Sequence, residues 1–519
     1  MLNEKKPIIL AILDGYGLAL PSKYNAITLA KKPNIDRLFE LYPGTKLGAT
    51  GVDVGLEEGQ MSGSESGHMN IGAGRVALQE SRIISDSIKS KSFFMSPALV
   101  GAISNVKKNK SQLHIMGLMG NGDSPHSNPE HFRALLRFAK RNELKNVYCH
   151  LFTDGRDSYP RSAYAHLQYF KNIIREEGIG KIATLCGRFY AMDRTRNWKR
   201  STKAYDAIVF GRGERADSPE EAIMKTYSEN LSDEYLLPTV IFERGKPIGK
   251  LSKDDSIIFF NLRSDRARQF TKLFVANNKK RIILDDMPII DKIKNLYFVA
   301  MTDFGPDLDV QTIFTREKLV ATLPMTLGDL QQLYIAESEK YAHITFFFNG
   351  GYADAVGGED RFIVDSPKVD SYIDTPRMSA DLITKKVLKE MQRNKYDFVA
   401  INYANADMVG HTGDLKATIR AIEALDDQIN LLAKEALKQS GTLIITADHG
   451  NAEDMFDESI NEANTFHTKN PVPLLIVNDK LKRKRLIRGG VLGDIAPTIL
   501  DLFEKEKPLE MKRNSLLQS

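Results

Sequence analysis

Short apolar runs alternate with longer amphipathic stretches along this chain. The apolar runs span Ile8–Leu13, Leu113–Met119, Val147–Phe152, Ile182–Cys186, Ile257–Phe260, Leu296–Met301, Ile344–Phe348, Phe398–Tyr403, Leu443–Ala447 and Pro473–Val477. Amphipathic stretches that are typical of helices include Pro129–Arg141, Ala163–Glu176 and Leu415–Leu437. Strands that alternate with helices are typical of α/β folds, in which most strands pair in parallel. The pattern therefore predicts an α/β fold with largely parallel sheets.

Most of these apolar runs end in a group of polar residues. Ligands bind beyond the carboxyl ends of the strands in open α/β sheets, so these groups are where we expect chemistry. Aspartate and histidine groups lie near the two ends of the chain, whereas arginine groups lie in its middle. The simplest arrangement is a first domain built from both chain ends, with a second domain inserted between them. Candidate junctions are Gly72–Gln79 and the stretch around Phe304–Arg316.

Composition and charge are those of an ordinary globular protein. The 519 residues are 42% hydrophobic and 27% charged, which excludes collagen-like, disordered and disulfide-scaffold classes. A net charge of +5 on a chain of this length does not argue for nucleic acid. Two cysteines, Cys149 and Cys186, form no CxxC pair and are expected to be buried in a reducing compartment.

We expect a cytoplasmic protein. Pro7–Leu13 is too short for the apolar core of a signal peptide, and it is followed at once by Asp14. No stretch approaches the roughly 18 apolar residues that a membrane span needs. The basic cluster Lys482–Arg485 is interpreted as a solvated loop.

The aspartate and histidine groups have the composition of a metal centre. Asp407 and His411 are four residues apart, so a helical turn would point both side chains the same way. Asp448 and His449 follow an apolar run directly, and His467 and Asp14 complete a set of three carboxylates and three imidazoles. Such ligands suit two Mn²⁺ or Zn²⁺ ions, and the oxygen-rich mixture favours Mn²⁺.

A serine-rich loop precedes the glycine-rich segment Gly72–Gly74. It contains Ser62, Ser64 and Ser66, and any of them is either a helix N-cap or a nucleophile activated by a metal ion. The N-terminus of a helix at this point would also bind phosphate well. The spacing alone does not distinguish the three serines.

The arginine groups favour an anionic substrate. Guanidinium groups match the oxygens of phosphate and carboxylate in two-pronged geometry, so several of them suit a small molecule that carries both. His126 is either a loop residue or a substrate contact, and Lys340 is either a surface residue or part of the site. The arginines at or just after predicted strands are Arg156, which precedes Asp157, and Arg188, Arg194, Arg263 and Arg266.

Several long motifs span nearly the full length of the chain: Asp14-Gly15, Ser64 with Asn70–Arg75, Phe152–Asp157, Gly187–Arg194, Arg263–Gln269, Glu339–Gly351, Asn402–Gly413 and Thr446–Asn451. Together they resemble the motifs of a known family, the cofactor-independent phosphoglycerate mutases of the alkaline phosphatase superfamily. Two loops depart from the usual family pattern. Gly63 replaces the asparagine before the nucleophilic serine, and Asn121–Pro125 differs from the usual Ser-Asp-Gly-Gly-Val before the histidine.

The resemblance implies the division of the chain and the roles of its residues. Residues 1–78 and 314–519 would form a dimetal, phosphatase-like catalytic domain, and residues 79–313 an inserted substrate domain. Ser64 would be the nucleophile. One Mn²⁺ would bind Asp407, His411 and His467, and the other Asp14, Ser64, Asp448 and His449. The substrate contacts would be His126, Arg156, Asp157, Arg188, Arg194, Arg263, Arg266 and Lys340.

The resemblance also implies the reaction. The expected enzyme is an isomerase of glycolysis and gluconeogenesis that interconverts 3-phosphoglycerate and 2-phosphoglycerate through a phosphoserine, without 2,3-bisphosphoglycerate. It is expected to be a monomer without nucleic acid or membrane partners. The alternatives are a metal-dependent phosphatase or phosphopentomutase of the same superfamily, and a binding protein that has kept the fold. The long arginine-rich segment argues against the first alternative, and the six intact metal ligands argue against the second.

Overall fold

The fold is described from a computed structural model that covers residues 6–275, 293–305, 307–315, 318–459, 461–482 and 484–518. The chain divides into two compact units, Met1–Gln79 with Lys318–Ser519 (unit 1) and Glu80–Glu317 (unit 2). Unit 2 continues past the expected limit at residue 313, because Phe314 pairs with Thr302 in its sheet. Residues 306 and 316 of the second candidate junction, and residue 483 of the basic cluster, lie outside the described residues.

Unit 1 is built on a mixed sheet with the order β13-β12-β14-β1-β15-β18-β2-β19. The strands from β13 to β15 run parallel, whereas β18 is antiparallel to both of its neighbours. The strands are β1 (Ile8–Leu13), β2 (Gly44–Gly48), β12 (Gln332–Glu337), β13 (Asp360–Val364), β14 (Phe398–Tyr403), β15 (Thr442–Thr446), β18 (Val472–Val477) and β19 (Gly490–Val491). A separate hairpin pairs β16 (Phe456–Asp457) with β17 (Glu462–Ala463).

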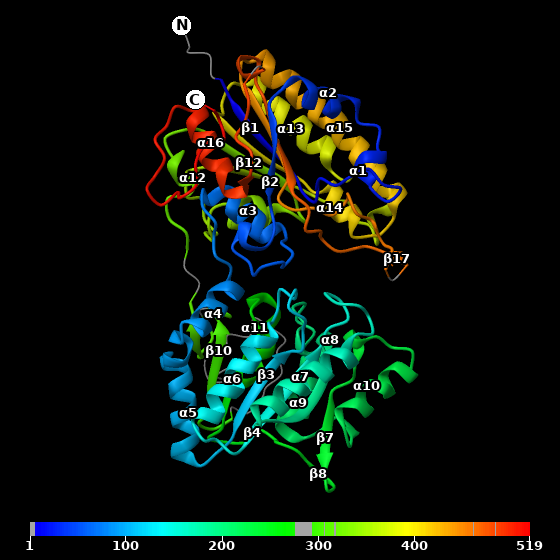
Figure 1. The fold of residues 1–519 in the computed structure, drawn as a ribbon, viewed down its shortest axis with the longest axis vertical. Coiled ribbons are helices and arrows are strands. Elements are labelled where there is room, and N and C mark those ends of the chain that lie inside the picture. Colours follow the sequence, from blue (N-terminus) through cyan, green and yellow to red (C-terminus); the bar gives the residue numbers. More distant parts are fainter. Residues whose placement is uncertain are drawn as a thin grey trace. The chain divides into compact units, whose positions relative to one another are not determined.

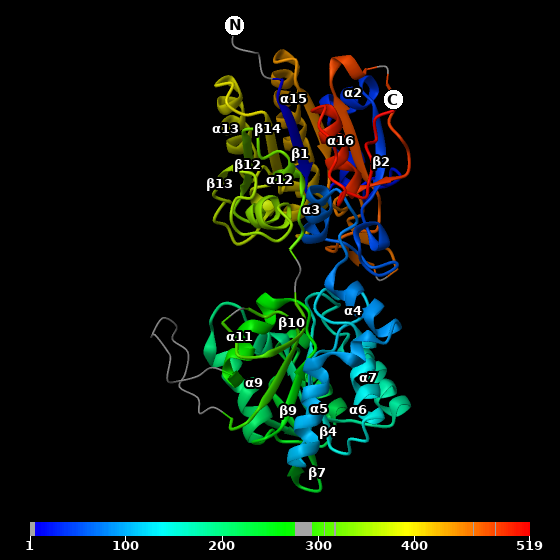
Figure 2. The same cartoon turned by 90° about the vertical axis from the view of Figure 1, so that its left-hand side faces the viewer.

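Helices cover both faces of this sheet, as Figures 1 and 2 show. One group packs around α15, and the other packs around α3. The first comprises α1 (Ala26–Leu29), α2 (Pro33–Leu41), α13 (Ala380–Gln392), α14 (Asn405–Gly410) and α15 (Leu415–Lys438); the second comprises α3 (Ser64–Ala73), α12 (Leu323–Thr326) and α16 (Ile495–Leu502). Every residue of the central strands β14, β1 and β15 is therefore buried, which explains their continuous apolar sequences.

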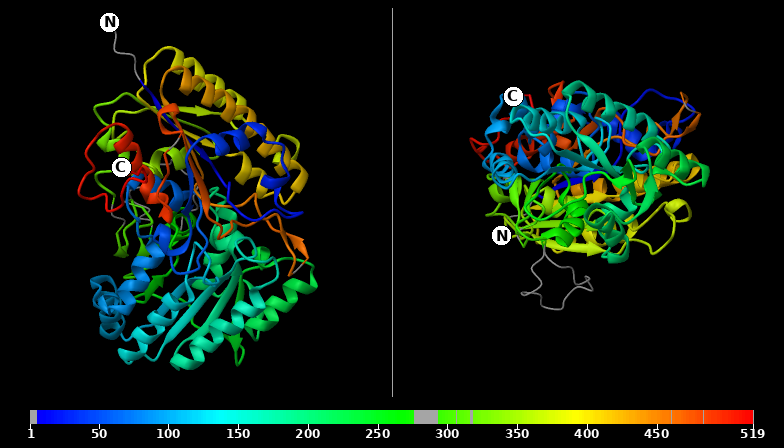
Figure 3. Two further views of the ribbon diagram at one scale, coloured as in Figure 1. Left: turned by 45° about the horizontal axis from the view of Figure 1, so that its top comes forward. Right: turned by 90° about the horizontal axis from the view of Figure 1, so that it is seen from below.

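Unit 2 contains a second sheet with the order β11-β10-β9-β3-β4-β5-β7-β6, and β8 pairs with β7. Its strands lie side by side in the left view of Figure 3. All pairs are parallel except β5–β7 and β7–β8. The strands are β3 (Leu113–Leu118), β4 (Val147–Thr153), β5 (Lys181–Gly187), β6 (Glu214–Ala216), β7 (Thr239–Glu243), β8 (Lys246–Pro247), β9 (Ser256–Phe259), β10 (Tyr297–Thr302) and β11 (Gln311–Phe314).

Two hydrophobic clusters fill the two faces of the sheet in unit 2. Figure 2 shows α9 and α11 on one side of the sheet and α5, α6 and α7 on the other. The first face carries α4 (Glu80–Lys89), α5 (Pro97–Asn109), α6 (Pro129–Arg141), α7 (Ala163–Glu177) and α10 (Pro219–Ser228); the second carries α8 (Arg188–Ala191), α9 (Trp198–Phe210) and α11 (Ser264–Val275). Proline follows a capping side chain at the start of α6 and α10, which fixes where these helices begin.

The predicted α/β fold with largely parallel sheets is confirmed. One apolar run was assigned wrongly: His343–Phe347 forms a π-helix, not a strand. The strand of this region is β12 (Gln332–Glu337). It begins and ends with a polar residue, so the sequence pattern did not indicate it. Both cysteines are buried and free, as expected. Among the described residues, no helix is long and apolar enough to cross a membrane.

Candidate active site

Strand order explains why residues from distant parts of the chain meet in unit 1. Strand β1 pairs in parallel with β14 on one side and with β15 on the other, so three carboxyl ends lie next to one another. Asp14 follows β1, and Asp407 lies in α14 just after β14. Asp448 and His449 follow β15. These carboxylates and the imidazole of His449 are buried.

Asp407, His411 and His467 form one cluster of potential metal ligands. Nε2 of His411 lies 3.2 Å from Asp407 Oδ1, and Nε2 of His467 lies 3.3 Å from the same oxygen. Nδ1 of His411 lies 2.7 Å from the backbone oxygen of Thr465, and Nδ1 of His467 lies 2.7 Å from that of Ser62. Because each Nδ1–H donates to a carbonyl, both Nε2 atoms are left to bind a cation.

A second cluster contains Asp14, Asp407 and His449, and a third contains Asp14, Asp448 and His68. Nε2 of His449 lies 3.4 Å from Asp14 Oδ1 and 3.6 Å from Asp448 Oδ2. Asp448 Oδ2 is buried, and His68 Nδ1 lies 3.1 Å from it, but the oxygen accepts no well-aligned hydrogen bond within the described residues. A buried carboxylate oxygen of this kind suits a cation, because its desolvation is only partly offset.

Lys340 lies among these carboxylates and is only 4% exposed. Its Nζ donates to Asp14 Oδ1 at 2.7 Å, to Asp407 Oδ2 at 2.6 Å and to Ser64 Oγ at 2.8 Å. Burial would raise the pKa of Asp14, but the Lys340 ammonium and the hydrogen bond with His449 hold that pKa well below its ordinary value. Lys340 therefore helps to keep Asp14 ionised, and the alternative of a surface lysine is wrong.

The structure distinguishes the three serines of the loop before α3. Ser64 Oγ lies 3.1 Å from both Asp14 Oδ1 and His449 Nε2, inside the ligand cluster. Ser62 Oγ instead donates to the backbone oxygen of Ala49. Ser66 Oγ donates to the backbone oxygen of Gly63 at 3.0 Å and accepts from its N–H at 3.3 Å. Ser64 alone of the three has its hydroxyl in the cluster.

The unusual Gly63 has a steric consequence at this loop. A Cβ at this position would lie 3.1 Å from Cε1 and 3.2 Å from Nδ1 of His467. Such contacts are tighter than ordinary van der Waals distances, so a larger residue would press against the imidazole. The backbone of Gly63 is extended, with φ of −151°, so its conformation does not require glycine. Only the close contact with His467 favours glycine over a larger residue.

Arg188 is the centre of the polar group in unit 2. It begins α8 directly after β5, and it is only 3% exposed. Its Nη1 donates to Asp154 Oδ1 at 2.6 Å and also to Asp157 Oδ2, and its Nη2 lies 3.1 Å from His126 Nε2. His126 Nε2 in turn lies 2.9 Å from Asp157 Oδ2. Burial would raise the pKa of Asp157, but His126 and Arg188 hold it well below its ordinary value.

Four arginines converge at the carboxyl ends of neighbouring strands in unit 2. Burial is the main cause that lowers the pKa of Arg266 to about 10, and the positive charges of Arg194, Arg188 and Arg156 lower it further. Arg156 and Arg194 are exposed. Arg156 forms an ion pair with Glu234 at 3.7 Å, and Arg194 donates a hydrogen bond to Asp265 at 2.7 Å. Mutual repulsion of this kind favours an anionic ligand.

Arg263 belongs to the same region. Its Nε lies 3.6 Å from Asp265 Oδ1, and its charge contributes to lowering the pKa of His126, for which burial is the main cause. The residues predicted for unit 2 thus follow β3, β4, β5 and β9, which are adjacent in the sheet. The structure brings His126, Asp157 and Arg188 into direct contact. The remaining arginines interact through their charges with this group or with one another.

Comparisons with known proteins match the whole chain. The metalloenzyme superfamily matches residues 6–507. The 2,3-bisphosphoglycerate-independent phosphoglycerate mutase of Clostridium botulinum is 46% identical over 518 residues, which cover 99% of this chain and 100% of that protein. The protein of the same name from Clostridioides difficile is 44% identical over 516 residues, 99% of either chain. The chain belongs to this mutase family.

A solved structure of the family agrees with the fold. The phosphoglycerate mutase of Leishmania mexicana, determined at low cobalt concentration, has a TM-score of 0.82 and 27% identity. The match covers 99% of this chain and 98% of that chain, so it includes both units. The resemblance inferred from the motifs is therefore confirmed at the level of the family.

Sequence reasoning missed two buried residues beside Ser64 and Asp14 in this mutase-family chain. His68 Nδ1 lies 2.9 Å from the backbone oxygen of Ser64 and 3.1 Å from Asp448 Oδ2. Asn402 Nδ2 donates to Asp14 Oδ2 at 2.7 Å and lies 3.0 Å from His68 Nε2. The spacing of four between Ser64 and His68 was the available signal, since it puts both on one face of a helix.

Asp154 is a third missed residue, in unit 2. It is 1% exposed, and its Oδ1 accepts the N–H groups of Arg156 at 3.1 Å and Asp157 at 3.0 Å as well as the Arg188 guanidinium. It therefore fixes the turn that carries two of the predicted residues. Its position at the end of β4 was the available signal.

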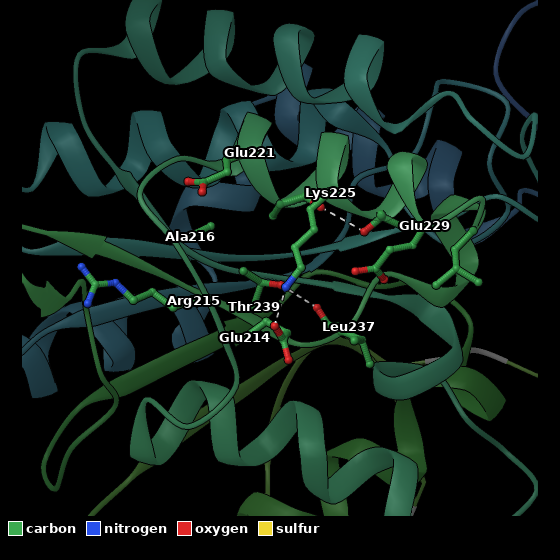
Figure 4. A pocket seen from close by; sticks show the side chains of 11 residues that line it. Glu214, Arg215, Ala216, Glu221, Lys225, Glu229, Leu237 and Thr239 are labelled. Atoms are coloured by element: carbon green, nitrogen blue, oxygen red, sulfur yellow. Dashed lines mark hydrogen bonds and ion pairs between the residues drawn. The ribbon is translucent and has the colours of Figure 1, made fainter.

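A separate pocket lies between β6 and α10 (Figure 4). Its lining includes Glu214, Glu221 and Glu229, and Lys225 Nζ donates to Glu214 at 2.7 Å. It contains none of the predicted site residues, all of which lie in the described part of the chain. We assign no role in the reaction to this pocket.

Proposed function

We propose that this chain interconverts 3-phosphoglycerate and 2-phosphoglycerate without 2,3-bisphosphoglycerate, through a phosphoserine at Ser64. Full-length similarity to mutases of that name supports the substrate. The observation that carries the mechanism is the position of Ser64 Oγ, which lies 3.1 Å from Asp14 Oδ1 and 2.8 Å from Lys340 Nζ. The reaction would serve glycolysis and gluconeogenesis.

We further propose that the centre in unit 1 holds two Mn²⁺ ions. Asp407, His411 and His467 would hold one, and Asp14, Ser64, Asp448 and His449 the other. The donor set supports this, because it offers carboxylate oxygens and imidazole nitrogens with no thiolate. Bound divalent ions would lower the pKa of a serine hydroxyl and stabilise the charge that develops on phosphoryl oxygens.

Ser64 would act as the nucleophile because the chain orients and activates its hydroxyl. It is the first residue of α3, so the phosphoryl group it accepts would lie at the positive end of a helix dipole. Lys340 would stabilise the phosphoryl oxygens as their negative charge shifts. Ser64 Oγ gives up its proton and forms a bond to phosphorus, the bond from phosphorus to the glycerate oxygen breaks, and that oxygen takes up one proton.

The residues of unit 2 would hold the glycerate part of the substrate. Arg188, Arg263 and Arg266 present guanidinium groups for its carboxylate and hydroxyls. Asp157 is ionised in the free site, so with His126 it would accept a proton from one of those hydroxyls and then return it. Arg156 and Arg194 are exposed at the same edge of the sheet, so they would add positive charge around the substrate.

Glycerate must stay bound between the two phosphoryl transfers. It reorients, and its other hydroxyl then takes the phosphoryl group back from Ser64. Were glycerate released, water would complete the reaction as a phosphatase. Several charged contacts to a small acid would slow its release, which supports transfer over hydrolysis.

We propose that the enzyme works as a cytoplasmic monomer on this small-molecule substrate, without nucleic acid or membrane partners. The weak net charge of +5 supports the expectation of no nucleic-acid partner, and the sequence has no CxxC pair, which fits a reducing compartment. Sedimentation equilibrium of the purified protein would test the oligomeric state. A dimer would contradict it.

One experiment tests the proposed function against the phosphatase alternative. Purified protein is given 3-phosphoglycerate with and without Mn²⁺, in the absence of 2,3-bisphosphoglycerate, and both 2-phosphoglycerate and free phosphate are measured. We expect 2-phosphoglycerate to form only with a divalent metal ion, with little free phosphate. Free phosphate as the main product would identify a phosphatase.

A further inference from the structure

Glu453 is a buried carboxylate that the proposed mechanism does not use. It lies in the turn that follows β15, five residues after Asp448, and it is 2% exposed. Its Oε2 accepts the N–H groups of Gly17 at 3.0 Å and Asn451 at 2.9 Å. Its Oε1 accepts Nδ2 of Asn470 at 3.0 Å and the hydroxyl of Thr468. All four donors therefore converge on one side chain.

The donors come from three segments, and each segment carries candidate metal ligands. Gly17 follows Asp14, Asn451 follows His449, and Thr468 follows His467. Backbone hydrogen bonds join the same segments, from Ala452 N to Gly15 O at 3.1 Å and from Thr468 N to Gly450 O at 2.9 Å. Glu453 thus links segments that lie far apart in the sequence.

Two glycines make room for this carboxylate. A Cβ at Gly17 would lie 2.3 Å from the Glu453 carboxyl group, and a Cβ at Gly450 would lie 2.3 Å from its Oε1. Both distances are shorter than any van der Waals contact. The local sequence therefore fits a glutamate that is packed closely against backbone on two sides.

We propose that Glu453 is a positioning residue for the metal centre, which sets the spacing of the segments that carry Asp14, His449 and His467. A carboxylate suits this role because it accepts at both oxygens, and all four partners are donors. The amide of glutamine has the same shape but only one accepting oxygen, so its NH₂ group would face two donors. The inference rests on the metal centre of the proposed function but not on the identity of the substrate.

The test compares Glu453→Gln with wild type and with Glu462→Gln, a control at an exposed glutamate between Glu453 and His467. Mn²⁺ alone is titrated into EDTA-treated protein, and bound Mn²⁺ is counted by equilibrium dialysis with electron paramagnetic resonance. Losing a residue that orients metal ligands typically weakens metal affinity 10- to 100-fold. We expect such a loss for Glu453→Gln, wild-type affinity for Glu462→Gln, and recovery of Glu453→Gln activity at saturating Mn²⁺.

The outcomes separate this inference from the proposed function. Wild-type Mn²⁺ affinity in folded Glu453→Gln would overturn the inference alone, whereas wild type that binds no Mn²⁺ would overturn the metal centre as well. Circular dichroism of the EDTA-treated proteins shows whether the variant is folded. Should Glu453→Gln not fold, Thr468→Val removes one donor and keeps the carboxylate. Unchanged Mn²⁺ affinity in Thr468→Val would then overturn the inference, and weakened affinity would support it.

Discussion

The contacts of Ser62, Ser64 and Ser66 predict three different consequences of replacement by alanine. Ser64 Oγ lies in the ligand cluster, 3.1 Å from Asp14 Oδ1 and from His449 Nε2. The other two hydroxyls bond backbone groups of the loop. We therefore expect Ser64→Ala to abolish the mutase reaction, and Ser62→Ala and Ser66→Ala to lower stability while they keep most of the activity.

The contacts give the size of each effect. Ser66→Ala removes the two bonds to Gly63 at the start of α3, and losing a helix cap costs about 1 kcal/mol of stability. Ser62→Ala leaves the buried backbone oxygen of Ala49 without this donor, which costs about 1–3 kcal/mol. Both losses are smaller than the roughly 5–15 kcal/mol that stabilises a typical domain, so both variants should fold. Removing the nucleophile should lower kcat by about 10⁴-fold or more.

The assay measures isomerisation and the site of phosphorylation together. Each variant is assayed with Mn²⁺ and 3-phosphoglycerate, and its stability is measured by urea unfolding. Wild-type enzyme is then quenched with acid during turnover, and mass spectrometry locates the phosphoryl group. Phosphate on Ser62 or Ser66, or near-normal turnover by Ser64→Ala, would refute the assignment of the nucleophile.

Three further predictions concern the metal centre, Arg266 and Glu337. Treatment with EDTA should remove the activity and Mn²⁺ should restore it, because bound divalent ions would lower the pKa of the Ser64 hydroxyl in the proposed mechanism. Full activity in protein shown by elemental analysis to be metal-free would contradict the dimetal centre. Arg266→Ala should lower kcat/KM by roughly 10- to 150-fold, because losing a charge-assisted contact costs about 1.5–3 kcal/mol. The Mn²⁺ content should not change. Normal steady-state kinetics would show that Arg266 does not bind substrate. Burial raises the pKa of Glu337 from 4.5 to about 7, so the folded chain holds a proton that the unfolded chain releases, and stability falls as pH rises through this window, by about 3 kcal/mol. Glu337→Gln should therefore be more stable than wild type in urea at pH 8 and equal to it at pH 4, and equal stability at both pH values would contradict a raised pKa.

The sequence predicted most of the strands that carry the site, because those strands are buried on both faces. Strands such as β14 and β15 are continuous apolar runs, and polar residues begin where burial ends. The same reasoning gave the wrong element for the run Ile344–Phe348, because a short apolar run fits a buried helical turn as well as a strand. The π-helix His343–Phe347 begins three residues after Lys340, so this misassignment also hid how that lysine reaches the site.

The residues that sequence reasoning missed share a physical property. His68, Asn402, Asp154 and Glu453 make side-chain hydrogen bonds to partners that are mostly distant in sequence. The chemistry of a metal ligand or a phosphate-binding arginine shows in its residue type, whereas the role of a supporting residue depends on which segments lie beside it. Only the tertiary structure supplies that information.

The register of the central strands connects the apolar strands with the polar residues that follow them. Leu13 lies opposite Tyr403, and the N–H of Asp14 donates to Tyr403 O at 3.0 Å, so the pairing of β1 with β14 fixes where Asp14 begins its turn. A slip of one residue would move Asp14 by about 3.3 Å and turn its side chain to the opposite face of the sheet. Neither Lys340 Nζ, now 2.7 Å away, nor Ser64 Oγ would then meet the carboxylate. The apolar residues of β1 thus determine where the Asp14 carboxylate lies relative to Lys340 and Ser64.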